Sequence, residues 1–197
     1  MRNIKIMTQE DVNKICKTRD SEGYAIFKDH ITFDMLIEFP SKCKFGEWCE
    51  FMGYNVFGKN CKFATGCSFG QYSKFGELCK FDRYTRIQIA CRFDEMCRFG
   101  EYNVFEMECC FKCYCEFEKH TTFGSRCEFS KGCIFDEYVT FNADTTFERD
   151  CKFGYNTSFA SRPKFRTINE VEQFLVPLTY EQFIKIRADF EPKHTEY

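Results

Sequence analysis

The sequence predicts an all-β solenoid, and three periodic features predict it. Phenylalanine occupies every sixth position from Phe27 to Phe165, with Ile87 as the single exception. A small residue, most often cysteine, stands two positions before most members of this aromatic series, and cysteine recurs at every eighteenth position from Cys43 to Cys151. A six-residue period fits neither an amphipathic helix nor a simple alternating strand, so each unit is interpreted as a short strand followed by a corner.

The eighteen-residue recurrence gives the number of sides of the coil. Three six-residue units close one turn, so residues eighteen apart are expected to stack above one another at the strand spacing of ~4.8 Å. The aromatic series then predicts about eight turns, in a rod on the order of 40 Å long. Phenyl rings and small residues are expected to fill the interior, because large and small side chains alternate within each layer.

The repeated unit resembles that of the hexapeptide-repeat proteins, which fold as left-handed parallel β-helices. Their pattern is a bulky aliphatic residue, then Gly, Ala, Glu or Asp, two variable residues, a small residue and another variable one. Residues 45–50 (Phe-Gly-Glu-Trp-Cys-Glu) and 99–104 (Phe-Gly-Glu-Tyr-Asn-Val) match it position by position. The resemblance covers about residues 25–165 and implies a left-handed coil. Phenylalanine replaces the usual Ile, Leu or Val, which enlarges the interior of each layer.

Both ends of the chain differ from the repeat. Residues 1–24 contain a capping-box motif at 8–11 (Thr-Gln-Glu-Asp) before apolar residues, which predicts a short helix, with a strand before it. Residues 167–197 contain two further capping boxes, which predict two helices separated at Pro177. Because the open ends of a β-helix expose unpaired backbone groups, we expect both segments to cap the repeat region, residues 25–166.

Composition favours a single packed domain with reduced thiols. The 197 residues are 44% hydrophobic and 19% aromatic, which is ample for a core. Fifteen cysteines would suit a secreted disulfide scaffold, but twelve occupy the inward small position and the N-terminus lacks the apolar run of a signal peptide. We therefore expect a cytoplasmic protein. No apolar run is long enough to predict a membrane span.

One outward column is aromatic. It lies three positions after members of the aromatic series, and its rings are expected to stack along one edge of the coil. Rows of exposed aromatics are typical recognition anchors, although such rings can also simply cover a corner. The predicted binding residues are Trp48, Tyr84, Tyr102, His120 and Tyr138.

One outward column carries no charge over seven turns, and the later turns of the neighbouring column are uncharged too. In a chain with 29% charged residues, such a strip is typical of a self-association surface, although a neutral solvated face is the alternative. We expect a homo-oligomer, either a dimer or a trimer, and members of the resembled family commonly form trimers. The predicted self-association residues are Ile89, Met107, Val104, Thr122 and Thr140.

A third outward column is basic over four successive turns, Lys44, Lys62, Lys80 and Arg98. Such a row could follow a chain of phosphates. However, the adjacent column supplies acidic residues, and the formal net charge of the whole chain is −2. We therefore do not expect a nucleic-acid partner and regard the row as solvated charge.

Catalytic and metal-binding patterns are sparse. The resembled family includes acyltransferases that use a histidine between subunits with acyl-coenzyme A as donor, and His120 is the one histidine expected on the coil wall. No orienting partner or pocket for it is apparent, so we assign no catalytic residue and retain His120 as the candidate. In the cluster at 109–115, Cys110 and Cys113 are expected to point outward and the other two cysteines inward, so neither a metal nor a cofactor is expected.

The expected function is therefore non-enzymatic binding or assembly. The rigid outer faces of the coil would serve protein–protein interaction or self-association. Two alternatives remain open at this point: a hexapeptide acyltransferase with an acyl-coenzyme A site between subunits, and an oligomer that sequesters a small ligand.

Overall fold

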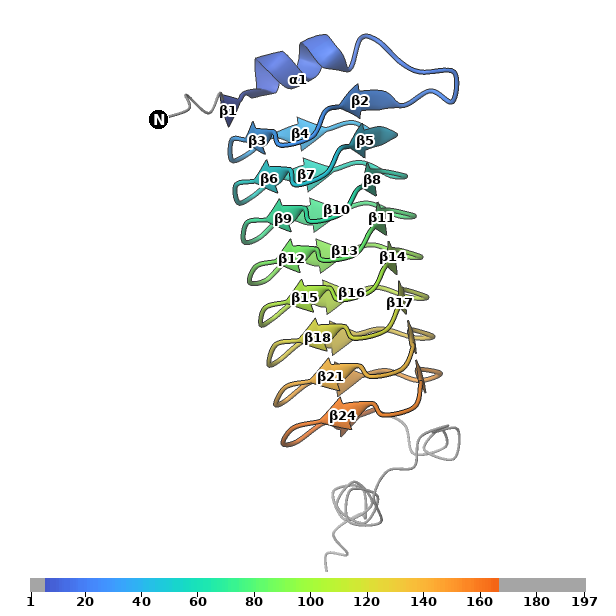
Figure 1. Cartoon of the computed structure of the whole chain (residues 1–197). Coiled ribbons are helices and arrows are strands. Elements are labelled where there is room, and N and C mark those ends of the chain that lie inside the picture. Colours follow the sequence, from blue (N-terminus) through green and yellow to red (C-terminus); the bar gives the residue numbers. More distant parts are fainter. Residues whose placement is uncertain (1–5, 167–197) are drawn as a thin grey trace, which may run out of the picture.

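The computed structural model describes residues 6–166, which form a parallel β-solenoid of about eight turns (Figure 1). Its strands lie in three sheets of nine, eight and eight strands, named here faces A, B and C. Residues eighteen apart are register partners, as in the pair Phe75 and Phe93. The predicted solenoid with an eighteen-residue turn is thus confirmed. The helices predicted within 167–197 lie outside the described residues.

Nearly every strand contains two residues, an outward residue followed by an inward member of the aromatic series. Face A consists of β1 (Ile6–Met7), β3 (Thr32–Phe33), β6 (Glu50–Phe51), β9 (Ser68–Phe69), β12 (Arg86–Ile87), β15 (Val104–Phe105), β18 (Thr122–Phe123), β21 (Thr140–Phe141) and β24 (Ser158–Phe159). Face B consists of β2 (Ala25–Phe27), β5 (Cys43–Phe45), β8 (Lys62–Phe63), β11 (Lys80–Phe81), β14 (Arg98–Phe99), β17 (Glu116–Phe117), β20 (Ile134–Phe135) and β23 (Lys152–Phe153). Face C consists of β4 (Glu38–Phe39), β7 (Val56–Phe57), β10 (Lys74–Phe75), β13 (Arg92–Phe93), β16 (Cys110–Phe111), β19 (Glu128–Phe129), β22 (Thr146–Phe147) and β25 (Lys164–Phe165).

Each corner is made by one residue in the left-handed backbone conformation. The non-glycine corner residues have φ between 55° and 64°, a region that few non-glycine residues adopt. Hydrogen bonds between turns hold them there: the N–H of Tyr84 donates to the carbonyl of Glu101, 3.1 Å away. The strand N–H groups donate to the preceding turn, as that of Lys80 does to the Cys61 carbonyl at 2.9 Å. Every turn is therefore bonded to its neighbours along the rod.

Stacked phenyl rings fill the interior. Rings of one face stack in parallel along the rod, as Phe45 and Phe63 do with centroids 4.9 Å apart and an interplanar angle of 3°. Rings of different faces meet edge to face, as Phe45 and Phe51 do at 5.0 Å and 87°. Both arrangements suit the aromatic quadrupole. The core is therefore solid from one face to the next, and between Phe27 and Phe165 only Ile87 interrupts its columns of rings.

The small inward positions carry the cysteine columns. Twelve of the fifteen cysteines are buried, and all fifteen are free thiols. Buried thiols donate to backbone carbonyls of the preceding turn, as Cys97 does to Gly76 at 3.5 Å. Burial raises the pKa of the Cys91 thiol to about 12, so this thiol stays protonated at neutral pH. Polar residues at equivalent positions are also bonded: the Asn103 amide donates to the Gly100 carbonyl at 2.9 Å.

The N-terminal segment covers the first turn. The predicted helix is present as α1 (Gln9–Ile15), with the capping box formed by Thr8 and Asp11 and with Val12 buried against the core. The strand predicted before it is β1, which pairs with β3 and so extends face A by one strand.

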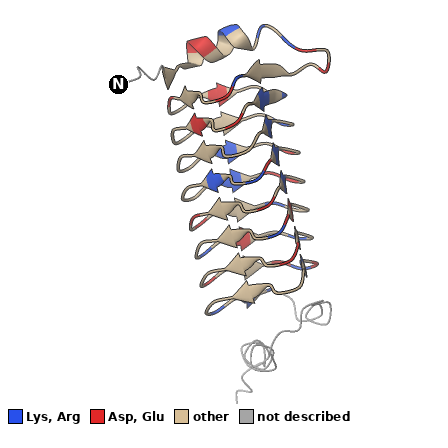
Figure 2. Cartoon of the chain, in the orientation of Figure 1, with Lys and Arg blue, Asp and Glu red and all other residues tan. Residues whose placement is uncertain are grey.

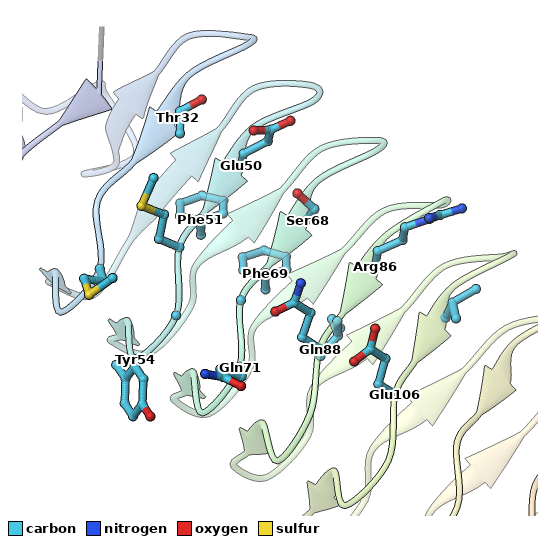
Figure 3. Close-up of a pocket in the computed structure, with 16 residues that line it drawn as sticks. Thr32, Glu50, Phe51, Tyr54, Ser68, Phe69, Gln71, Arg86, Gln88 and Glu106 are labelled. Carbon is cyan, nitrogen blue, oxygen red and sulfur yellow. The ribbon is translucent and has the colours of Figure 1, made fainter. Parts of the chain in front are cut away.

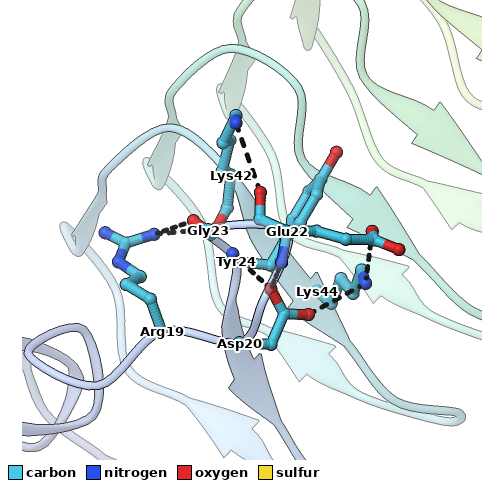
Figure 4. A network of polar contacts seen from close by, with 7 residues as sticks. All are labelled: Arg19, Asp20, Glu22, Gly23, Tyr24, Lys42 and Lys44. Carbon is cyan, nitrogen blue, oxygen red and sulfur yellow. Dashed lines mark hydrogen bonds and ion pairs between the residues drawn. The ribbon is translucent and has the colours of Figure 1, made fainter.

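The loop between α1 and β2 is fastened by a polar network (Figure 4). The Asp20 carboxylate accepts the N–H of Tyr24 at 2.7 Å and the Lys44 ammonium at 3.0 Å, and these hydrogen bonds lower the pKa of Asp20, the Tyr24 bond most. Arg19 donates to the carbonyl of Lys42 at 2.9 Å. The ammonium groups of Lys44 and Lys62 lie 4.5 and 4.6 Å from the Tyr24 ring centroid.

Candidate functional site

A cavity of about 790 Å³ runs along the N-terminal half of face A (Figure 3). It is hollow because Ser68 and Gly70 stand at outward positions where the other turns that line it carry larger side chains. Gly70 is required there, because an added Cβ would lie 2.7 Å from the Gly53 Cα of the preceding turn. Met52 and Tyr54 line its N-terminal part. We call this cavity the face A groove.

The groove combines apolar side chains with isolated charges. Met35 is 52% exposed and Met52 is 36% exposed, whereas Glu50, Arg86 and Glu106 occupy separate turns along the length of the groove. Within residues 6–166, Arg86 has no ion-pair partner. Apolar contact area with a few separated charges is typical of protein–protein interfaces and differs from a pocket in which catalytic groups converge.

The predicted aromatic column lies on the edge between faces A and B. Its rings stack in sequence: Tyr84 on Tyr102 at 5.3 Å, Tyr102 on His120 at 4.7 Å and His120 on Tyr138 at 5.0 Å between centroids. Trp48 lies over Gly66 of the next turn, where no side chain obstructs it. The structure therefore brings the predicted binding residues into one column, with Gly66 interrupting the stack of rings after Trp48.

His120 lies between two rings of that column. Its backbone N–H donates to the Glu137 carbonyl at 3.2 Å. Among the described residues no hydrogen bond to its imidazole is formed, and His120 lines neither the face A groove nor the smaller cavity beside Tyr72. The orienting partner that a general base requires is thus not provided by residues 6–166.

The predicted self-association residues separate into two groups. Val104, Thr122 and Thr140 are consecutive register partners on face A, and Val104 also lines the groove. Ile89 and Met107 lie at the corner beyond that face. The guanidinium of Arg126 lies 3.4 Å from the Met107 sulfur and pairs with Glu108 at 2.6 Å, so charges border the strip at this corner.

Sequence reasoning missed the face A groove and a second aromatic edge. The signal for the groove was small outward residues in adjacent turns, Gly53, Ser68 and Gly70. The second edge lies between faces A and C, where Tyr54 stacks on Tyr72 with centroids 5.1 Å apart. It too could have been found by reading every eighteenth residue.

The cationic column on face B is partly neutralised. Figure 2 shows basic residues on the strands of the N-terminal half of the rod. Lys44 pairs with Asp20, and Arg98 pairs with Glu116 at 3.0 Å. Lys80 has no ion pair within the described part of the chain. These pairings leave the column with less free charge than the sequence alone suggested.

The outward and inward cysteines of the 109–115 cluster are placed as their register predicts. Cys109 and Cys115 are buried, while Cys110 and Cys113 are half-buried at the surface. Over residues 6–166, His, Cys, Asp and Glu side chains form no group arranged to hold a metal ion. In the same range, no helix has the length and apolarity needed to cross a bilayer.

The fold and its surfaces define a parallel β-solenoid with a solid core and an open groove on one face. Comparison of the chain with protein-family models, with curated proteins and with solved structures found no match in any of the three.

Proposed function

We propose that the protein is a non-enzymatic binding or assembly protein and that face A is its interaction surface. The observation that carries this proposal is the face A groove, an amphipathic hollow on a rigid sheet. Because the phenyl core and the hydrogen bonds between turns fix the backbone, side chains on this face are presented without a large ordering cost. Preorganisation of that kind favours association.

Self-association is the occupant that we favour for face A. Val104, Thr122 and Thr140 continue from the groove as a flat, uncharged row, which a second copy could cover without burying unpaired charge. The alternative is a different protein partner seated in the groove, with the stacked aromatics Tyr84 and Tyr102 as further anchors.

The repeat type of the coil and the location of the protein are further parts of this proposal. We assign the coil to the left-handed hexapeptide-repeat type, supported by the six-residue period and the corner residues of positive φ. We also propose a cytoplasmic location, supported by fifteen free thiols.

A matched pair of substitutions tests the role of face A. Val104→Glu introduces a charge on face A, and Ile134→Glu introduces one on face B at a residue of nearly equal exposure, 42% against 43%. We expect the native mass of the full chain, measured by light scattering after gel filtration, to fall for Val104→Glu and to stay unchanged for Ile134→Glu.

The measurement separates the possible occupants. If both variants keep the native mass of an oligomeric parent, face A is not the assembly surface. If the parent chain is a monomer, self-association is excluded, and capture of a partner that Val104→Glu alone abolishes would support the groove as a partner site.

A further inference from the structure

The aromatic column between faces A and C stops where one more ring would fit. Tyr54 and Tyr72 stack at 5.1 Å, and the next corner residue along the rod is Ala90. A cavity of about 430 Å³ opens beside Ala90, lined by Tyr72 on one side and Glu108 on the other. On the edge between faces A and B, the corresponding positions carry consecutive rings. The Ala90 notch is therefore a gap in an aromatic stack.

The dimensions of the notch suit a single planar ring. Tyr72 and Glu108 are two turns apart, which corresponds to roughly 9.6 Å at ~4.8 Å per turn. One ring midway between them would lie about 4.8 Å from the Tyr72 ring, the spacing expected of stacked aromatics. Tyr72 stacks on Tyr54 with one side of its ring, so its other side faces the notch.

The wall of the notch on face C is cationic. Lys74 and Arg92 are register partners on β10 and β13, and both line the cavity. Neither forms an ion pair or a side-chain hydrogen bond with any residue in the range 6–166. The acidic residue in the lining, Glu108, is already paired with Arg126 at 2.6 Å. Burial raises the pKa of the remaining polar lining group, the Cys110 thiol, so it adds no negative charge at neutral pH.

We propose that the Ala90 notch binds a small planar aromatic ring that carries an anionic group. The ring stacks on Tyr72 in the place left by Ala90, and the anion lies between the ammonium of Lys74 and the guanidinium of Arg92. Aromatic stacking and charge-assisted hydrogen bonds then act on one ligand together. This site is separate from the face A groove and does not depend on the proposed function.

Titration calorimetry of the full-length protein tests the proposal with ligands that separate ring from anion. Adenosine monophosphate carries both, adenosine carries only the ring, and ribose 5-phosphate carries only the anion. Indole-3-acetate tests a carboxylate in place of the phosphate. We expect at least one of the two aromatic anions to bind at least about tenfold more tightly than adenosine and ribose 5-phosphate, because each fragment loses one of the two interactions.

Substitutions then locate the binding. Ala90→Tyr should abolish it by filling the notch, and it should fold, since Ala90 has φ 59° and Tyr84 adopts φ 60° at an equivalent corner. Leu78→Tyr, at φ 61° on the edge between faces B and C, is the matched control and should bind as the parent does. Lys74→Gln and Arg92→Gln should each weaken binding of the aromatic anion by about tenfold.

Two results would overturn the proposal. One is the absence of binding for both adenosine monophosphate and indole-3-acetate. The other is binding that survives in a folded Ala90→Tyr variant. Binding of only one of the two would support the notch and identify which combination of ring and anion it prefers.

Discussion

Ile87 is the one residue at which the stack of inward rings is broken. It is buried between Phe69 and Phe105 of the same face, and those two rings have no aromatic neighbour at its level on that face. The aliphatic side chain fills the space by dispersion but provides no ring-to-ring geometry.

Replacing this residue by phenylalanine should stabilise the fold. In Ile87→Phe the new ring would stack on Phe69 and Phe105, and each good aromatic pair contributes ~0.5–1.5 kcal/mol beyond burial. The measurement is the free energy of unfolding in urea. Ile87→Ala is the control and should lose ~2–5 kcal/mol through the cavity it leaves. A destabilised Ile87→Phe would mean that the interior is narrower at this level than at the other turns.

At the scale of the element, the cysteine columns determine which thiols of the coil can react. Twelve thiols point inward, and only Cys16, Cys110 and Cys113 are partly accessible to solvent. The buried thiols, such as that of Cys91, donate to carbonyls of the preceding turn and are packed away from solvent reagents. For Cys91, burial also raises the pKa, which makes this thiol a poor nucleophile at neutral pH.

Thiol labelling should therefore distinguish three cysteines from twelve. With an aromatic disulfide reagent at neutral pH we expect up to three thiols to react in the native protein and all fifteen in guanidinium. Mass spectrometry after alkylation identifies the reactive positions. Rapid labelling of Cys79 or Cys97 in the native state would contradict the packed ladder described above.

The elements differ in how far the sequence could predict them. The solenoid and its three faces follow from two periods, and α1 follows from the capping box at Thr8, because both signals are local or strictly repeated. The face A groove was not predicted, since it results from small residues on two adjacent turns, Gly53, Ser68 and Gly70. The position of Arg126 over Met107 depends on a side-chain conformation that no period encodes.

At the scale of the whole molecule, the turn is the unit of stability. Each turn contacts mainly its neighbours. A solenoid should therefore tolerate the loss of a complete turn, because the remaining residues of every column still stack on one another. Deleting residues 118–135 removes eighteen residues and would place Tyr138 directly beside Tyr102, where His120 stood, which continues the aromatic column.

The length of a deletion therefore tests whether the eighteen-residue period governs the packing of the turns. We expect the eighteen-residue deletion to melt cooperatively by circular dichroism, with the strand content of one turn lost. Deletion of residues 118–126, half that length, should leave the downstream part unfolded, because it moves each later phenylalanine from an inward position to a corner. A nine-residue deletion as stable as the eighteen-residue one would show that the period does not govern packing.

The direction of the hydrogen bonds between turns has a mechanical consequence. The bonds from one turn to the next, such as those of Lys80 and Tyr84, run along the rod, so tension applied to its two ends loads them in series. The turns should then peel away one at a time, each releasing roughly 60 Å of chain at about 3.4 Å per residue. Compression and bending are instead resisted by the packed phenyl rings. The molecule should therefore resist compression and bending better than it resists tension along the rod.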